Sequence, residues 1–435
     1  MVAAGELRIG DRCGAGQRLK QCWHLDYRFA AGFEQADPQS MKIPMPSVRV
    51  EASHKRHQPG IRFVDRMLWL VLAGVCALPF ACQSATPSKV LKRSTTQYFE
   101  TVQSLAFSPD GKVLAVGSSA ASLQAASSPG DQPLPEGIIE LWDVNAGKKT
   151  TTLRQSARSQ SGDTFNKVGS LTFSPDGKWL IGGDVPGYTL WEVSTAQQKF
   201  KWRAGIMEPL SPGWSADGKW IALPTMVDPA AAAYESFPHG VALIDALTGK
   251  PKKFFPVEIG YPRAARISPD GKLLATAGHD CTVRVFDTQS LSNVFTDFTE
   301  TTLFAVGFTP DGNCLVAGPT WGGTLLIYAV SAENGKTSIS KKGTSSQRTG
   351  EEIRCLEFTP DKKNALSVAP HGSIRIWDTS KWTTVALVAG CSSGCLSPDG
   401  AQVALCREKQ PEVIEVWSLP EFINVFRASA SPGEN

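Results

Sequence analysis

Apolar and polar positions alternate along this chain in short runs, and one repeated tetrapeptide separates them. "VQSLAF" (Val102–Phe107) alternates before "SPDG", and "KVLAV" (Lys112–Val116) is apolar after it. Alternation with a period of two predicts a half-buried β-strand. The two runs are therefore expected to form a hairpin, with the tetrapeptide as its turn.

The tetrapeptide or a close variant occurs seven times. Proline fixes φ at about −65°, which suits the second position of a type I turn, and glycine takes the left-handed conformation that closes a short hairpin. Successive aspartates of the turns stand 66, 41, 53, 41, 50 and 38 residues apart, which indicates a unit of about 40 residues with insertions. The turns are Ser108–Gly111, Ser174–Gly177, Ser215–Gly218, Ser268–Gly271, Thr309–Gly312, Thr359–Lys362 and Ser397–Gly400.

A third alternating run follows each hairpin, and a weaker fourth one comes next, such as "KTTTL" (Lys149–Leu153). Units of this kind cannot each bury a core alone, and stacking them radially buries their faces. The pattern therefore predicts an all-β fold, a seven-bladed β-propeller of four-stranded antiparallel blades. The third runs are Ile138–Val144, Tyr188–Val193, Val241–Ala246, Thr282–Thr288, Thr324–Val330, Ser373–Thr379 and Val413–Leu419.

Several third strands end in an aromatic residue followed by an acid: Trp142-Asp143, Trp377-Asp378, Phe286-Asp287 and Trp191-Glu192. With these endings, from about Val102 to Arg427, the chain resembles the WD-repeat β-propeller family. It departs from the family in that no blade carries the Gly-His pair that usually precedes its first strand, and the loop aspartate that partners this pair survives only at Asp280. The family's buried hydrogen-bond network is therefore not assigned. Six-bladed periplasmic propellers share the turn, but seven turns favour the WD-repeat interpretation.

Two segments compete to supply the outer strand that closes the ring. "KVLKRST" (Lys89–Thr95) precedes the first repeat, and "FINVFRA" (Phe422–Ala428) follows the last third strand. The C-terminal segment is favoured, because it directly follows the blade that it would complete. On this interpretation residues 98–428 form the propeller, 83–97 a linker and 429–435 a tail.

An apolar run of 16 residues, Met67–Cys82, lies between Arg66 and a polar stretch. It is short for a membrane-spanning helix, which needs about 20 residues, and it fits the core of an export signal better. Residues 1–66 lack sustained periodicity and are expected to be a disordered extension. Because an export signal stands at the start of a chain, translation is expected to begin at Met41 or Met67.

Cys82 follows the small residue Ala81 and precedes a polar tether, so this site resembles the lipidated cysteine of bacterial lipoproteins. Three alternatives stay open, namely a cleaved signal without lipid, a short uncleaved anchor and a buried cytosolic segment. The protein is accordingly expected to be exported and attached to the cell envelope, either as a lipoprotein or in the periplasm.

Charge gives no indication of nucleic-acid binding. Residues 1–82 hold 11 Lys and Arg against 7 Asp and Glu, and the remaining residues hold 33 against 34. The net charge of +3 therefore comes from the N-terminal part, and the propeller is nearly neutral. We expect a monomer that binds protein partners and, through its N-terminal lipid or anchor, a membrane.

No catalytic or metal-binding motif stands out. A phosphate-binding loop and a His-Glu-x-x-His pair are both missing from the sequence. Cys391 and Cys395 could form a disulfide or belong to the core, and they lack the second ligand pair of a zinc site. The sequence therefore predicts a protein without enzymatic activity and without a cofactor.

Insertions concentrate on one face of the predicted disc. Ser118–Gly137 and Pro224–Gly240 both interrupt the loop between strands two and three, and by WD-repeat topology such loops lie opposite the repeated turns. Across all blades, the loops between strands two and three supply the candidate partner-binding residues Trp321, His239, His279, Asp280 and His371. Long loops on a rigid scaffold are a frequent location for binding sites, although they are also tolerated as surface insertions. A metal site shared by the histidines is the less favoured alternative.

These features predict a non-catalytic protein-interaction platform tethered at the cell envelope. The main alternative is a periplasmic propeller that binds a small molecule, or acts as an enzyme, through its central channel. That alternative requires polar residues clustered around the channel. Fold alone does not separate the two functions.

Overall fold

The computed structural model describes residues 86–93, 101–121, 135–155, 168–183, 187–203, 211–225, 239–257, 260–320, 323–333 and 336–428. These residues all belong to one of the two compact units into which the chain divides. The expected extension at 1–66, the apolar segment Met67–Cys82 and the tail at 429–435 lie outside the described residues, as does Trp321.

Five sheets of the described part each contain four antiparallel strands that are consecutive in the sequence. The first two are β2 (Thr101–Phe107), β3 (Val113–Ala121), β4 (Pro135–Asp143) and β5 (Lys148–Gln155), then β6 (Ser170–Phe173), β7 (Trp179–Gly183), β8 (Gly187–Glu192) and β9 (Gln197–Arg203). The next two are β10 (Gly213–Trp214), β11 (Trp220–Thr225), β12 (Gly240–Asp245) and β13 (Pro251–Pro256), then β14 (Pro262–Ile267), β15 (Leu273–Gly278), β16 (Thr282–Asp287) and β17 (Asn293–Phe298). The fifth is β18 (Leu303–Phe308), β19 (Cys314–Pro319), β20 (Leu326–Glu333) and β21 (Lys336–Thr344).

The remaining sheet has seven strands in the order β1-β27-β26-β25-β24-β23-β22. Its 14-residue strand β25 pairs with β24 through its first part and with β26 through its last part. The strands are β1 (Lys89–Lys92), β22 (Cys355–Phe358), β23 (Asn364–Val368), β24 (Gly372–Asp378), β25 (Thr383–Leu396), β26 (Gln402–Arg407) and β27 (Gln410–Ser418).

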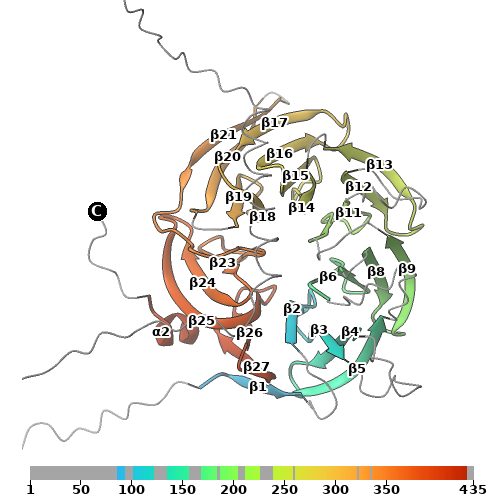
Figure 1. The fold of residues 1–435 in the computed structure, drawn as a ribbon, viewed down its shortest axis with the longest axis vertical. Helices are drawn as coiled ribbons and strands as arrows, with labels where there is room; N and C mark the ends of the chain where they lie inside the picture. The colour runs from blue at the N-terminus through green and yellow to red at the C-terminus, as the bar shows by residue number, and fades with distance from the viewer. Residues whose placement is uncertain are drawn as a thin grey trace, which may run out of the picture. The chain divides into compact units, whose positions relative to one another are not determined.

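The sheets stand around a common centre, as in a β-propeller (Figure 1). Strands β2, β14 and β18 lie near the centre of the ring, and β5, β9, β13, β17 and β21 follow its outer edge. Apolar side chains of neighbouring sheets pack together between them; Ile139 of β4 and Leu180 of β7, for example, are both fully buried in one cluster. The expected all-β architecture of four-stranded antiparallel sheets is confirmed.

The repeated tetrapeptides form hairpin turns that are nearly identical in detail. In the first, the Ser108 hydroxyl donates to the Asp110 carboxylate at 2.6 Å and accepts from the Val113 N–H at 2.9 Å, and the Lys112 N–H donates to Asp110 at 3.1 Å. Gly111 has φ of +70°, the conformation that glycine adopts most readily. These repeated residues therefore build the fold, as predicted.

The favoured closing strand was wrong. The N-terminal strand β1 pairs with β27, with Lys89 opposite Val416 and Lys92 opposite Val413. Part of the expected linker thus supplies the outer strand, and the segment after β27 forms the helix α2 (Leu419–Val425).

The reason lies in a helix start signal at the end of β27. Ser418 is the N-cap of α2, its hydroxyl accepts from the Glu421 N–H, and proline occupies the first turn, where its missing N–H has no cost. Phe422 is then fully buried against the sheet. Only the end of the segment pairs with the sheet: the Phe426 carbonyl accepts from the Leu387 N–H, and the Ala428 N–H donates to the Val385 carbonyl of β25.

Candidate binding face and central pocket

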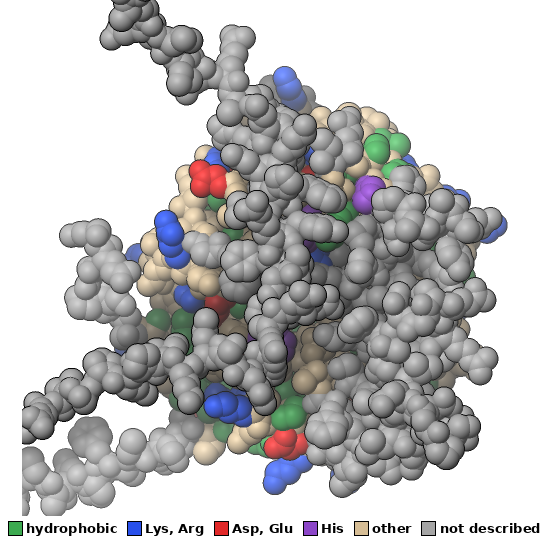
Figure 2. All heavy atoms as spheres, viewed as in Figure 1, with side chains coloured by type: hydrophobic (Ala, Val, Ile, Leu, Met, Phe, Trp, Pro, Cys, Tyr) green, Lys and Arg blue, Asp and Glu red, His purple; other side chains and the backbone are tan. Residues whose placement is uncertain are grey.

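The three candidate histidines lie in separate loops of the same class. His239 precedes β12, His279 follows β15 and His371 precedes β24, so each lies between the second and third strands of its unit. The histidine side chains visible in Figure 2 stand apart from one another. Among the described residues, no group of three or more side chains could hold a metal ion.

His279 belongs to an aromatic cluster beside the centre of the ring. Its ring lies between Tyr261, with centroids 4.5 Å apart, and Phe304, with centroids 5.2 Å apart. The Arg263 guanidinium lies 3.7 Å from the centre of the Phe304 ring, within the range of a cation–π contact. The cluster combines flat apolar surface with positive charge.

Asp280, next to His279, is only 3% exposed. Its carboxylate accepts from the Thr282 hydroxyl and forms an ion pair with Arg284 at 3.1 Å, and burial raises its pKa. The carboxylate is thus occupied within its own sheet. That Asp280 and its neighbours contact a partner stays a prediction.

The other two candidate histidines differ in exposure. The His371 side chain is 64% exposed, and its Nδ1 lies 3.0 Å from Glu408 Oε1, in the loop between β26 and β27. His239 is partly buried, and burial lowers its pKa. Of the two, His371 is the one placed to meet a partner.

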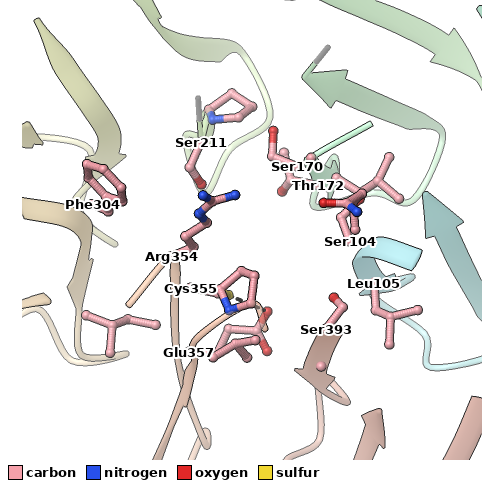
Figure 3. Close-up of a pocket in the computed structure, with 18 of the residues that line it drawn as sticks. Ser104, Leu105, Ser170, Thr172, Ser211, Phe304, Arg354, Cys355, Glu357 and Ser393 are labelled. Atoms are coloured by element: carbon pink, nitrogen blue, oxygen red, sulfur yellow. Dashed lines mark hydrogen bonds between the residues drawn. The ribbon is translucent and has the colours of Figure 1, made fainter. Parts of the chain in front are cut away.

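A pocket of about 350 Å³ occupies the centre of the ring, where the inner strands meet (Figure 3). Its lining includes four hydroxyl-bearing residues from four different sheet regions, namely Ser104, Thr172, Ser211 and Ser393. Val368 and Pro370, at the end of β23 and in the loop after it, also line it. The pocket therefore reaches the face that carries the second-to-third-strand loops.

Arg266 of β14 is held in the pocket wall by four hydrogen bonds. Its guanidinium donates to the backbone oxygens of Ser211 at 3.2 Å, Pro212 at 2.8 Å and Ala265 at 3.0 Å, and to the Ser211 hydroxyl at 2.8 Å. All four acceptors are uncharged. Burial lowers the pKa of this guanidinium, the direction expected for a cation removed from water, and the nearby Glu357 carboxylate opposes that shift.

Glu357 of β22 occupies a comparable place in another part of the wall. Its carboxylate accepts from the Leu396 N–H at 2.6 Å, and Cys355 Sγ lies 3.6 Å from its Oε1. Burial raises the pKa of Glu357 and raises that of Cys355 well above its usual value. Cys355 is therefore held as a thiol, the weakly nucleophilic form.

Sequence reasoning missed this pair, although the register of the repeats contains a signal. Arg266 and Glu357 both stand two residues before the first residue of a turn. The other five copies carry uncharged residues there: Ala106, Thr172, Gly213, Gly307 and Cys395. The hairpin turn does not require a charged residue at this position, since five copies lack one. Arg266 and Glu357 are therefore specific to the two strands on which they lie.

The cysteines do not form the disulfide that the sequence left open. Cys391 and Cys395 are both free and buried in the structure. Burial raises the pKa of Cys391 to about 12. Both thiols pack as small core residues.

Parts of the chain match one known protein family. The family described as WD domain, G-beta repeat matches residues 89–123, 154–184, 258–287 and 341–378. Two of these segments contain an aromatic-acid ending named above, Phe286-Asp287 and Trp377-Asp378. The comparisons support the WD-repeat family.

Three curated relatives show local similarity to the chain. The small ribosomal subunit protein RACK1 of Schizosaccharomyces pombe is 25% identical over 28% of this chain and 39% of its own length. WD repeat-containing protein SL1-17 of Schistosoma mansoni is 29% identical over 34% of this chain and 43% of its own length. The serine-threonine kinase receptor-associated protein of Gallus gallus is 23% identical over 63% of this chain and 70% of its own length. The chain thus spans about two fifths of the first two relatives, and a larger part of the third.

In the part of the chain that could be searched, the helical segment is neither long nor apolar enough to cross a membrane. Met67–Cys82 lies outside that part.

Proposed function

We propose that the protein is a non-catalytic interaction platform, a seven-bladed WD-repeat propeller tethered at the cell envelope. The observation that carries the proposal is the match to the WD-repeat family along the ring of four-stranded sheets. Two matched relatives carry names that place them in assemblies, one as a ribosomal subunit protein and one as receptor-associated. The same kind of role is proposed for this chain.

The proposed blade count follows from the register of β25. Divided at Cys391, the seven-stranded sheet gives one group of β22, β23, β24 and the first part of β25. The other group is the last part of β25 with β26, β27 and β1. With the five four-stranded sheets these groups make seven blades, in agreement with the seven turns.

We place the partner on the face of the second-to-third-strand loops. The opposite face repeats nearly the same turn, with Ser108–Asp110, Ser174–Asp176 and Ser215–Asp217 hydrogen bonds all 2.6 Å long. A surface that repeats itself around a ring offers little to distinguish one partner from another. The loop face instead presents individual features, among them the His371–Glu408 pair and the cluster around His279.

The tether is proposed from the sequence of the N-terminal part. Met67–Cys82 fits the apolar core of an export signal, and Cys82 is the proposed lipidated residue. The strand β1 begins seven residues after Cys82, so this tether would be short. A short tether would hold the propeller close to the membrane surface.

Affinity capture tests the platform directly. The protein is captured from its own solubilised envelope fraction, alongside a variant with 122–134 and 226–238 replaced by short Gly-Ser linkers. We expect a stoichiometric partner with the wild type that is lost with the variant. A variant with Lys178→Ala on the turn face should keep the partner, because this exposed side chain only pairs with Asp176. A partner retained by the shortened variant, or found with neither protein, contradicts the proposed face.

A further inference from the structure

Positive charge is concentrated on the outer edge of the ring. The outermost strand segments are β1, β5, β9, β13, β17, β21 and the first part of β25. These segments contain 13 of the 33 Lys and Arg residues that follow residue 82, but only one of the 34 Asp and Glu residues, Asp297. A propeller with almost no net charge therefore carries a basic rim.

The basic residues are not spread evenly along this rim. The strands β1, β5 and β9 follow one another around the ring, and together they hold eight Lys and Arg and no acid (Figure 1). The strands β17 and β25 hold no Lys or Arg. A hydrogen bond links β1 to the turn before β5, since Lys89 Nζ donates to Asn145 Oδ1 at 2.9 Å. The strands β1, β5 and β9 are called the basic arc below.

Most of the charge on the basic arc is not balanced within the protein. Lys149 pairs with Glu140 at 3.0 Å, and Lys199 Nζ lies 5.8 Å from the centre of the Trp179 ring. Four exposed lysines have no described carboxylate within 4.0 Å of their amino groups, namely Lys92, Lys148, Lys199 and Lys201. The arc thus presents positive charge to its surroundings.

Protection of the sheet edges does not account for this distribution. Charged side chains on an outer strand hinder its pairing with other molecules, and acidic residues can take this role as well as lysines. The outer strand β17 has no lysine, and its side chains Val294 and Phe298 are 42% and 46% exposed. A single sign of charge on consecutive strands indicates instead a surface that meets negative charge.

We propose that the basic arc contacts an anionic phospholipid surface. A flat surface touches only a limited part of a round rim, and the arc is the part where the chain enters the ring through β1. The choice of a membrane over another polyanion rests on the proposed tether, because β1 begins seven residues after Cys82. A lipid anchor and a basic patch together hold a protein at a membrane more firmly than either one alone. Contact through the rim also leaves the loop face open to a protein partner.

Flotation with lipid vesicles tests this contact. The full-length Cys82→Ser protein is used, so that no lipid can attach at this residue, and low ionic strength limits the screening of surface charges. We expect binding to mixed vesicles of phosphatidylglycerol and phosphatidylcholine to be at least tenfold stronger than binding to phosphatidylcholine alone. This binding should fall sharply at about 0.15 M salt, where the tether is needed to keep the arc at the membrane.

Two pairs of substitutions decide whether the arc makes the contact. Each lysine near an anionic surface strengthens binding about fivefold, so Lys148→Gln combined with Lys201→Gln should weaken vesicle binding at least tenfold. Lys336→Gln combined with Lys342→Gln is the matched control, because it removes the same charge from β21, outside the arc. The control should bind like the Cys82→Ser parent. All four side chains are exposed, so neither pair should disturb the fold.

Three results would overturn the proposal. Equal binding to both kinds of vesicle would exclude the anionic surface, and equal effects of the two pairs of substitutions would exclude the arc. Binding of a short DNA duplex without binding of the anionic vesicles would assign the arc to another polyanion. Failure of the tether is measured separately, by fractionation of cells that carry Cys82→Ser, and does not change the vesicle results.

Discussion

Arg93 and Glu140 form a buried ion pair where the first and last parts of the ring meet. Arg93 follows β1 and is 5% exposed, and Glu140 of β4 is 4% exposed, with 2.6 Å between Nε and Oε2. Arg93 also donates to the Pro411 carbonyl at 3.1 Å, and Glu140 accepts from the Trp142 indole at 3.3 Å. The pair therefore joins three segments that are far apart in the sequence.

Removing Arg93 should destabilise the protein strongly, because it leaves Glu140 buried with only Lys149 as a cationic partner. For Arg93→Met we expect a loss of about 3 kcal/mol in the free energy of unfolding, measured by urea denaturation. Lys112→Met is the matched control, since the Lys112–Asp110 pair is exposed and should contribute less than about 1 kcal/mol. Equal effects of the two substitutions would contradict a structural role for the pair.

The contribution of this pair should depend on pH. Burial alone would raise the pKa of Glu140, but Arg93 and Lys149 hold it below the usual value of 4.5. A carboxyl group with a lowered folded-state pKa stabilises the protein above its unfolded-state pKa, and this stabilisation is lost as pH falls through the folded-state pKa. The stability difference between wild type and Arg93→Met should therefore be constant above about pH 5 and shrink below it. A difference that stays constant down to the acid unfolding transition would count against this account.

At the scale of elements, the central structural point is that the ring is closed by β1. Leu91 of β1 is fully buried in a cluster with Val416 of β27 and Leu114 of β3. Its neighbour Val90 is 44% exposed, as alternation along a strand requires. A single strand thus contributes core contacts to both ends of the ring.

Truncation of these two neighbours should separate their roles. Leu91→Ala should cost about 2–5 kcal/mol in unfolding free energy, because it leaves a cavity in that cluster. Val90→Ala should change stability by less than about 0.5 kcal/mol. Urea denaturation of both variants gives the comparison. A silent Leu91→Ala would mean that β1 does not close the ring.

The sequence was most informative where a residue pattern is repeated and local. The turns were predictable because Ser, Pro, Asp and Gly each satisfy a requirement of the hairpin within four residues. The closing strand was not, because pairing of Lys89–Lys92 with Val413–Val416 depends on residues more than 300 positions away. Helix α2 carries a readable start signal in Ser418, Pro420 and Glu421, but the apolar run that follows, Phe422–Phe426, predicts a strand by its composition.

The candidate site was less predictable for a related reason. Loop histidines were identified by residue type, and the structure sets them apart in space. Arg266 and Glu357 are unremarkable in their local sequence. They become significant only because the ring brings their strands to one pocket, which also contains Trp214 and Arg354.

At the scale of the whole molecule, the proposed tether predicts where the protein is found. Cys82→Ser should move the protein from the membrane fraction to the soluble fraction of the envelope, because the lipid attachment site is lost. Cys76→Ser is the matched control, since Val75 before it does not suit lipid attachment, and it should stay with the membrane. Fractionation followed by immunoblotting gives the readout. Membrane association that survives Cys82→Ser would exclude the lipid tether and favour an uncleaved anchor.

The most direct measurement of the central proposal is site-specific photo-crosslinking in the native cell envelope. A photoreactive phenylalanine derivative is placed at His371 on the loop face and, separately, at Lys178 on the turn face. Both side chains are exposed, at 64% and 75% respectively. The platform account predicts a discrete covalent adduct with another protein from position 371 and none from position 178. Adducts from both positions, from position 178 alone, or from neither would contradict it.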